Sequence, residues 1–321
     1  MKVIEHLQKA KGPLISFELI PPKRGGDITS LMAVIEDLLK YNPPFIDITS
    51  HSAEVNYDET PSGIRKKIKR KRPGTLGICA LIQHKYNVDA VPHILTKGFT
   101  REETEDFLIE LNYLGIENLL AIRGDDSGYD KPIPEGKSVN KYACDLVKQI
   151  VGMNNGHYLE ENLLDANPSN FCIGVGGYPE KHFESPNLKM DIEYVKQKVE
   201  AGADYVVTQM FYDNKVYFRY VELCRKAGIN VPIIPGLKIM TNKSHLMTVP
   251  KNFYVNIPEE LSDEVMAAKP EQILDIGVDW AAKQVEDLFE NNVPGVHFYI
   301  MQNSKPVKRL MERLKYFKRI A

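Results

Sequence analysis

The chain has 321 residues, of which 43% are hydrophobic and 26% charged, and its formal net charge is −2. This composition is typical of a globular protein with a large core, and the charge argues against a general nucleic-acid-binding surface. The four cysteines form no C-x-x-C pair, which indicates a reducing compartment without a disulfide framework or a structural zinc site. No apolar run approaches the ~18 residues of a membrane span, and the first residues do not resemble a signal peptide, so we expect a cytoplasmic protein.

Apolar runs in the first eighty residues predict strands over 14–20, 45–49 and 76–80, after a short N-terminal helix. Asp27 is a helix N-cap candidate, because Leu31 begins a helical repeat of apolar residues directly after it.

Two stretches interrupt this pattern. All but one of residues 65–72 are Lys or Arg, and we interpret them as the solvated face of a helix because they lead directly into Pro73-Gly74. Residues 83–97 are interpreted as a long connection. Thr100 and Glu103 then form a capping box that starts the next helix.

From residue 100 onward the alternation is regular. Strands are expected over 119–122, 171–175, 205–208, 231–234 and 296–299. Helices are expected between them, around 142–151, 191–201, 216–226 and 281–290. Three of the helices in this half end at a glycine, as helix C-termini commonly do; these glycines are Gly115, Gly202 and Gly228.

Eight strands, most of them followed by a helix and without a linker, predict an α/β protein whose residues 1–321 form a single (β/α)8 TIM barrel. Right-handed crossovers force such an alternation into a parallel sheet. The count of eight favours a closed barrel over an open doubly wound sheet, and no G-x-G-x-x-G follows the first strand. Function is then expected at the C-terminal ends of the strands.

The predicted strand ends carry carboxylates, aromatic residues and glycines, without metal-ligand spacing. Such a lining suits a large planar cofactor better than a metal. The residues are Glu18, Thr49, Arg123-Gly124-Asp125, the run from Gly176 to His182, Gln209, and His297-Phe298-Tyr299.

Glu18 is the strongest acid–base candidate. Its neighbours Phe17 and Leu19 are apolar, so the carboxyl is expected in a poorly solvated site that raises its pKa and lets it act as a general acid. The alternative is an ion pair with Lys23 or another barrel lysine. Gln209 follows an apolar strand, and its amide can donate and accept at once, as recognition of a heterocycle requires.

Other candidates also have two interpretations. The run from Leu119 to Asp126 is either a buried strand that opens into a polar pocket or a strand that ends in an Asp-rich turn. His182 suits a ligand contact or a loop histidine bonded to backbone, and Lys198 suits a buried contact or a solvated helix surface.

Several short motifs follow one another along the chain, and their order is more specific than any one of them alone. They are Ser16-Phe17-Glu18, Pro21-Pro22-Lys23, the runs Leu120 to Asp125, Gly177 to His182, Val195 to Asp204, Thr208 to Asp213 and Ile233 to Gly236, and His297-Phe298-Tyr299. In this order, from about Leu14 to about Tyr299, the chain resembles the methylenetetrahydrofolate reductases, flavin-dependent (β/α)8 enzymes of one-carbon metabolism and methionine synthesis. It resembles their short form, without an added C-terminal regulatory domain.

The resemblance implies a two-step, ping-pong reaction. NADH or NADPH passes hydride to FAD and leaves, and 5,10-methylenetetrahydrofolate then takes its place. Glu18 would be the general acid that helps open the five-membered ring to an iminium, and the reduced flavin would give 5-methyltetrahydrofolate. Asp125 would be a second catalytic residue that hydrogen-bonds the pterin, and Gln209 would contact whichever substrate is bound.

The resemblance also implies the residues that contact FAD. They are Thr49, His93, Arg123, Gly124, Asp125, Ala143, Tyr178, His182, Asp191 and Lys198. The charge and hydrogen bonds of His182 and Lys198 suit the diphosphate and ribityl parts of the cofactor.

The chain departs from the family pattern at three places that touch nicotinamide and folate contacts more than flavin contacts. Ser50-His51-Ser52-Ala53 follows Thr49, Lys243 replaces a substrate-stacking aromatic residue, and Gln302-Asn303 replaces an arginine. Two alternatives therefore stay open, a flavin-binding subunit that needs a partner for electrons and a flavin-free barrel lyase. We expect small-molecule partners, neither a membrane nor nucleic acid, and leave a homo-oligomer open.

Overall fold

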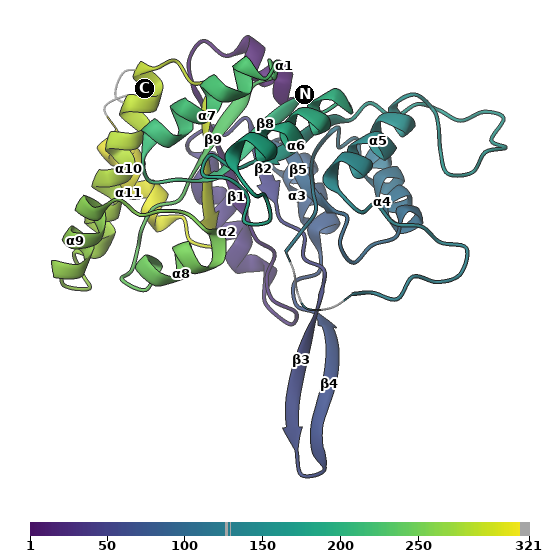
Figure 1. Cartoon of the computed structure of the whole chain (residues 1–321), viewed down its shortest axis with the longest axis horizontal. Coiled ribbons are helices and arrows are strands. Elements are labelled where there is room, and N and C mark those ends of the chain that lie inside the picture. Colours follow the sequence, from purple (N-terminus) through teal and green to yellow (C-terminus); the bar gives the residue numbers. More distant parts are fainter. Residues whose placement is uncertain (126–127, 129, 315–321) are drawn as a thin grey trace.

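Eight parallel strands close into a barrel in the computed structural model of the chain, which describes residues 1–125, 128 and 130–314 (Figure 1). They are hydrogen-bonded in the order β1-β10-β9-β8-β7-β6-β5-β2. Their bounds are β1 Leu14–Leu19, β2 Phe45–Ile48, β5 Asp89–Leu95, β6 Asn118–Ile122, β7 Cys172–Gly177, β8 Tyr205–Met210, β9 Ile233–Leu237 and β10 Gly295–Met301. The predicted (β/α)8 barrel is confirmed.

Helices surround the barrel and one of them closes its N-terminal end. Their bounds are α1 Val3–Lys9, α2 Ile28–Leu39, α3 Thr75–Lys85, α4 Arg101–Tyr113, α5 Ala143–Asn154, α6 Leu188–Glu200, α7 Asn214–Lys226, α8 His245–Phe253, α9 Glu259–Ala267, α10 Ile273–Glu290 and α11 Lys305–Arg313. Helix α1 inserts Val3 into the apolar cluster of the strands' inner faces. Within the described part of the chain, no helix combines the length and the apolar character that crossing a membrane requires.

The predicted helix ends are present. The Asp27 carboxylate accepts a hydrogen bond from the Thr29 N–H at 2.9 Å, at the start of α2. Thr100 and Glu103 form the capping box of α4, with side chain and backbone bonded reciprocally at 3.2 and 2.9 Å. Gly115, Gly202 and Gly228 have φ of 65°, 115° and 87°, the left-handed conformation in which glycine is favoured.

The prediction of a third strand over 76–80 was wrong, because these residues lie in α3. The strand is β5, within the stretch that was interpreted as a connection. Pro92 has no N–H to donate and His93 is polar, so the pattern of β5 does not resemble that of an interior strand. The count of eight strands was nevertheless right, because the false strand and the missed strand cancel.

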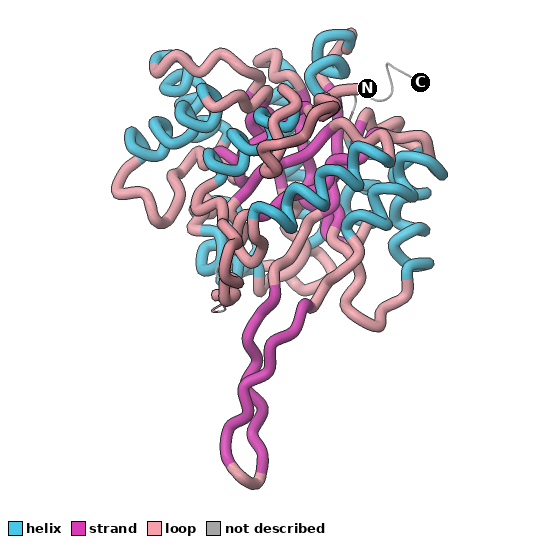
Figure 2. Tube along the Cα trace, turned by 90° about the vertical axis from the view of Figure 1, so that its right-hand side faces the viewer, coloured by secondary structure: helices cyan, strands magenta, loops and turns pink. Residues whose placement is uncertain are grey.

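The basic cluster over 65–72 was also misassigned. Its residues are not a helix but mostly belong to β4 Gly63–Arg70, which pairs antiparallel with β3 Ala53–Thr60. Ile64 and Ile68 are four residues apart, a spacing that fits one face of a helix as well as one face of a strand, so the pattern did not separate the two. This hairpin extends away from the barrel in both views (Figures 1 and 2).

The inside of the barrel has an apolar base. We call its buried members the inner apolar cluster: Val3, Phe45, Val91, Leu120, Cys172, Tyr205, Val207 and Ile234. Gly174 makes room for one large ring, since a Cβ there would lie 2.4 Å from the ring of Tyr205. Gly236 does the same for Tyr299, at 2.6 Å. Polar side chains begin above this base, toward the C-terminal ends of the strands.

Two helical glycines give a matched test of this packing. A Cβ on Gly277, in α10, would lie 1.8 Å from the backbone oxygen of Met240, whereas one on Gly77, in α3, would meet nothing within 4 Å. We expect Gly277→Ala to lower the free energy of unfolding by ~2 kcal/mol or more. Gly77→Ala should leave it unchanged or raise it by up to ~1 kcal/mol. Thermal unfolding of both variants measures this, and equal effects would contradict the packing around α10.

Candidate active site

The C-terminal ends of the strands and the loops that follow them form the mouth of the barrel. Side chains on a strand alternate between its two faces, so a residue two positions beyond a member of the inner apolar cluster also points inward. Asp47 and His93 satisfy this rule on β2 and β5, whereas the register of β8 shifts between Val207 and Met210, so the rule does not extend to Gln209. Glu18 joins them from β1, since its carboxyl lies beside His93. The structure therefore brings Glu18, Asp47 and His93 together on the inner face of the mouth, and Gln209 lies near the C-terminal end of β8.

Glu18 lies in a poorly solvated site. Its side chain is 13% exposed, and its Oε2 lies 3.6 Å from Nε2 of His93. Burial raises the pKa of Glu18 from 4.5 to about 7, against the opposing attraction of His93. A carboxyl with this pKa keeps a proton on a large share of molecules at neutral pH.

The alternative of a Glu18–lysine ion pair is not found among the described residues. Lys23 is exposed, and the nearby Lys238 donates to the backbone oxygen of Tyr299 at 3.4 Å. Burial lowers the pKa of Lys238, while the charge of Glu18 opposes that shift. The charge of Lys238 therefore lowers the pKa of Glu18 and partly offsets the effect of burial.

A buried polar group lies beneath Glu18. Asp47 is 1% exposed, and its Oδ2 lies 3.4 Å from Nε2 of His93. On the other side, its Oδ1 lies 4.0 Å from Nδ1 of His297, which is hydrogen-bonded to Ser16 Oγ at 2.8 Å. These contacts link β1, β2, β5 and β10.

Burial favours the neutral forms of this group. It raises the pKa of Asp47 from 3.8 to about 7, and it lowers the pKa of both His93 and His297. Asp47 is not among the residues that the sequence predicted for the site. The available signal was an ionisable residue between Ile46 and Ile48, in a strand that is buried on both faces.

The loop after β6 carries three of the predicted cofactor contacts. Gly124 has φ of 90°, and a Cβ there would lie 3.4 Å from the Leu95 side chain, so glycine suits the position. Arg123 donates to the Glu184 carboxylate at 2.8 Å. Asp125 is exposed at the rim. Asp126, the second carboxylate of this run, lies outside the described residues.

Tyr178 and His182 come from the loop between β7 and α6. Their rings meet edge to face, with centroids 4.6 Å apart. Burial raises the pKa of Tyr178 to about 12 and lowers that of His182. His182 accepts a hydrogen bond from the Glu184 N–H at 3.3 Å, so it is a part-buried ring with a backbone contact.

Lys198 is not the solvated surface lysine that its helix suggested. Its ammonium donates to the backbone oxygen of Gly176, 2.5 Å away, and burial lowers its pKa to about 8. Asp191, on the same helix, is 3% exposed and accepts from Ser185 Oγ at 2.7 Å. Ala143 is the first residue of α5, so the free N–H groups of that helix start at the mouth.

Several buried side-chain atoms lack a hydrogen-bond partner in the described structure. Among them are Thr49 Oγ1, His93 Nε2 and Asp191 Oδ2, each on a predicted cofactor contact, and also His51 Nδ1. Buried polar atoms are normally paired, so these atoms indicate where a ligand would supply partners. Within the described ranges, no three His, Cys, Asp or Glu side chains gather as metal ligands.

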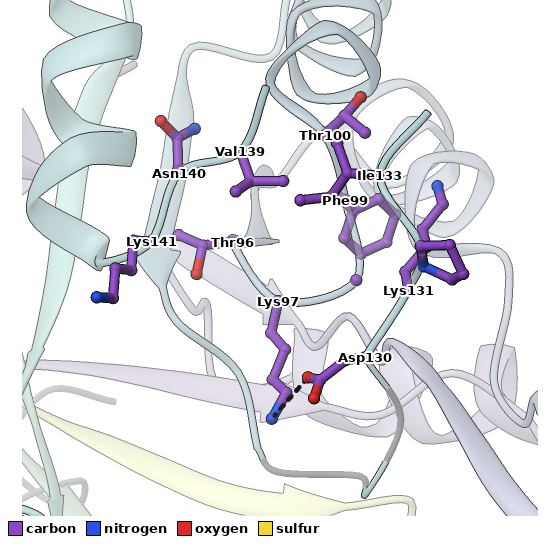
Figure 3. Close-up of a pocket in the computed structure, with 12 residues that line it drawn as sticks. Thr96, Lys97, Phe99, Thr100, Asp130, Lys131, Ile133, Val139, Asn140 and Lys141 are labelled. Atoms are coloured by element: carbon purple, nitrogen blue, oxygen red, sulfur yellow. Dashed lines mark ion pairs between the residues drawn. The ribbon is translucent and has the colours of Figure 1, made fainter. Parts of the chain in front are cut away.

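Figure 3 shows a separate cavity of about 320 Å³. It lies between the loop after β5 and residues 130–141, and its wall includes Lys97, Lys131 and Lys141. The Lys97 ammonium lies 3.9 Å from the Asp130 carboxylate, and the Lys97 N–H donates to the Arg123 carbonyl at 2.9 Å. The cavity therefore lies beside the loop that carries Arg123, and none of the residues that line it is a predicted cofactor contact.

Gln209 and the departures from the family pattern also have defined places. Gln209 lies within β8 rather than after it, and its Oε1 accepts from the Met210 N–H at 2.9 Å. Lys243 donates to the Met266 carbonyl at 2.6 Å and so contacts α9. Asn303 accepts from the Lys305 N–H at 3.1 Å, at the start of α11.

Known proteins resemble this chain in sequence. Residues 2–315 match the family model described as methylenetetrahydrofolate reductase. The chain belongs to the methylenetetrahydrofolate reductase family. Two relatives show how far the similarity extends.

Methylenetetrahydrofolate reductase 1 of Schizosaccharomyces pombe is 32% identical over 302 residues, which are 93% of this chain and 45% of that protein. The 5,10-methylenetetrahydrofolate reductase of Pectobacterium carotovorum is 26% identical over 294 residues, 91% of this chain and 86% of that one. The chain spans about half the length of the eukaryotic reductases it matches.

Solved structures support the same architecture. An uncharacterized protein from Clostridium thermocellum, described as binding two copies of 5-methyl-5,6,7,8-tetrahydrofolic acid, has a TM-score of 0.58 and 12% identity. The match covers 99% of this chain and 100% of that one. An oxaloacetate acetylhydrolase gives a TM-score of 0.53 at 9% identity, covering 97% and 82%. At these identities the likeness concerns the fold alone.

The protonation of Asp47 is testable through stability. Because its pKa is raised in the folded state, its stabilising contribution is complete below about pH 4 and decreases as pH rises toward about 7. The Asp47→Asn variant lacks this loss, so its Tm relative to wild type should rise from pH 5 to pH 8, by ~2 °C or more. Scanning fluorimetry across this range measures it. A Tm difference that falls with pH would mean that Asp47 is ionised and held by an imidazolium.

Proposed function

We propose that this chain catalyses flavin-dependent reduction of 5,10-methylenetetrahydrofolate to 5-methyltetrahydrofolate with NADH or NADPH, as one catalytic unit in the cytoplasm. The observation that carries the proposal is the carboxyl of Glu18, whose burial on the inner face of the barrel mouth raises its pKa to about 7. Relatives named for NADH, in Arabidopsis thaliana, and for NADPH, in Caenorhabditis elegans, support a nicotinamide donor.

Glu18 supplies the proton in this account. Opening the five-membered ring of the folate breaks a carbon–nitrogen bond, and the departing nitrogen must be protonated while an iminium forms. A neutral carboxyl is the form that donates, and a pKa of about 7 keeps it populated at neutral pH. His93 lies 3.6 Å from the carboxyl, where its ring steadies the carboxylate left after donation.

FAD fits the unpaired atoms of the mouth. It supplies a two-electron carrier that accepts hydride from the nicotinamide and returns it to the folate carbon. Thr49, His93 and Asp191 each offer a buried polar atom without a partner, and Lys198 adds a cation. The cavity beside Arg123, with its three lysines, suits the phosphate end of the cofactor.

Asp125 and Gln209 are the proposed folate contacts. Asp125 accepts hydrogen bonds only, whereas the amide of Gln209 both donates and accepts, which together match the N–H groups and ring nitrogens of a pterin. Asp125 is exposed at the rim, where a substrate entering the mouth meets it. The Clostridium thermocellum protein described as a folate binder, with the same architecture, supports folate binding by such a barrel.

The first functional test separates the two half-reactions in a Glu18→Gln variant. The variant should bind FAD and be reduced by the nicotinamide donor like wild type, because neither step needs the carboxyl proton. Folate reduction should slow by ~10²-fold or more. Stopped-flow absorbance of each half-reaction measures this, with the surface variant Glu110→Gln as control. Equal loss in both half-reactions would make Glu18 a structural or cofactor-holding residue.

The second test concerns Asp125. Asp125→Asn keeps the size of the side chain but removes its charge and turns one acceptor oxygen into a donor amide. We expect weaker folate binding, by ~10-fold or more, and a slower folate half-reaction, because hydrogen bonds to charged groups contribute roughly 1.5–3 kcal/mol. Titration of the flavin signal with folate gives the dissociation constant. Unchanged folate kinetics would remove Asp125 from the substrate site.

A further inference from the structure

The β3–β4 hairpin has one apolar face that the described structure leaves uncovered. The strand register places Tyr57 opposite Lys66, Val55 opposite Ile68 and Glu59 opposite Ile64, all on one face. Tyr57, Ile64 and Ile68 are 67%, 74% and 52% exposed. Three large apolar side chains therefore project into solvent along one side of the hairpin.

The opposite face is charged, and its acidic residues form ion pairs within the hairpin. Asp58 pairs with Lys67 and lies 3.8 Å from Arg65, and Glu54 lies 3.8 Å from Lys71. An isolated two-stranded hairpin is at best marginally stable in water. Covering the apolar face is therefore the interaction that this hairpin lacks.

The base of the hairpin is fixed to the barrel. Arg70 donates to the His51 carbonyl at 3.0 Å, and its guanidinium lies 5.3 Å from the centroid of the Phe99 ring. Arg72 donates to the Pro21 carbonyl at 2.6 Å, and the Arg24 N–H donates to the Lys71 carbonyl at 2.7 Å. The hairpin is held pointing away from its own barrel in both views (Figures 1 and 2).

The charges of the chain indicate what the hairpin meets. Residues 53–72 hold seven Lys or Arg and three acidic residues, a formal charge of +4, whereas the whole chain has −2. The rest of the chain therefore carries −6. Two hairpins packed on each other would bring like charges together, but a hairpin on the body of a second copy would bring opposite charges together.

Helix α9 is a suitable acidic surface. Four of its nine residues are acidic, and it ends beside Met266, which is 58% exposed. The neighbouring α8 exposes 78% of Met247, and Lys243 ties the two helices through the Met266 carbonyl. Both helices lie at the lower edge of the body in Figure 1, the side from which the hairpin extends.

We propose that the β3–β4 hairpin is a dimerisation arm that docks its apolar face on the α8–α9 surface of a second copy. A two-fold axis makes this contact twice, since each copy offers one hairpin and one α8–α9 surface. Tyr57, Ile64 and Ile68 meet exposed methionines such as Met247, while Lys66, on the same face of the hairpin, meets the carboxylates of α9. The contact is independent of the proposed reaction.

Sedimentation equilibrium of the full chain at micromolar concentration tests the arm. Wild type should be a dimer. The triple variant Tyr57→Ser/Ile64→Ser/Ile68→Ser should dissociate at least ~100-fold more readily, because each apolar side chain loses its burial. The control Leu163→Ser/Leu164→Ser changes two leucines that are 49% and 96% exposed elsewhere, and it should stay dimeric. Far-ultraviolet circular dichroism confirms that each variant is folded.

A charge swap tests the docking surface itself. Lys66 lies on the docking face and forms no ion pair with the described residues, so Lys66→Glu leaves the hairpin's own pairs in place. We expect Lys66→Glu to weaken the dimer ~10-fold or more, and adding Glu260→Lys to restore it. A monomeric wild type, a dimer that persists in the triple variant, or a swap that fails to restore association would overturn the proposal.

Discussion

The exclusion of water from the Glu18 carboxyl is the constraint on which the rest of this site depends. A carboxyl at a strand end normally ionises near pH 4.5, and its shift to about pH 7 corresponds to roughly 3 kcal/mol in favour of the protonated form. Burial outweighs the attraction of His93 and of Lys238, both of which favour the ionised form. The closed barrel produces this burial, because it surrounds the carboxyl with the inner faces of its strands.

The same closure explains the polar group beneath Glu18. Asp47 and His297 are each 1% exposed, and a pair of fully ionised groups at that depth would carry a large desolvation cost. Keeping Asp47 and His297 neutral avoids that cost. The neutral Asp47 also keeps its proton close to the Glu18 carboxyl. Glycine has the complementary role, because Gly174 and Gly236 leave space for Tyr205 and Tyr299. Small and large residues thus alternate around the barrel and shape its mouth.

The sequence predicted most of the barrel, because strands and helices of a (β/α)8 fold keep distinct apolar periods and their helices end at glycine. It failed at β5, where Pro92 and His93 interrupt the apolar run, and at the hairpin, where the four-residue spacing of Ile64 and Ile68 among seven cations also fits a helix. Asp47 was missed for another reason. Its role depends on contacts with His93 and His297, which are distant in the sequence. They become neighbours of Asp47 only when β1, β2, β5 and β10 close together.

Some of the predicted site residues could be found from the sequence pattern and others could not. Glu18 could be identified because its neighbours Phe17 and Leu19 are apolar, a pattern that predicts a buried strand even before its partners are known. Lys198 could not, since its helix pattern is that of a surface residue, and only the packing of α6 on β7 shows that its ammonium reaches the Gly176 carbonyl. The family resemblance supplied this residue where periodicity did not.

The absorbance spectrum of the purified protein, recorded anaerobically before and after NADH or NADPH and then after 5,10-methylenetetrahydrofolate, tests the central claim most directly. The account predicts an oxidised flavin spectrum that the nicotinamide bleaches and the folate restores, with release of 5-methyltetrahydrofolate. A colourless protein that does not take up added FAD, or a bleached flavin that the folate fails to reoxidise, would contradict it.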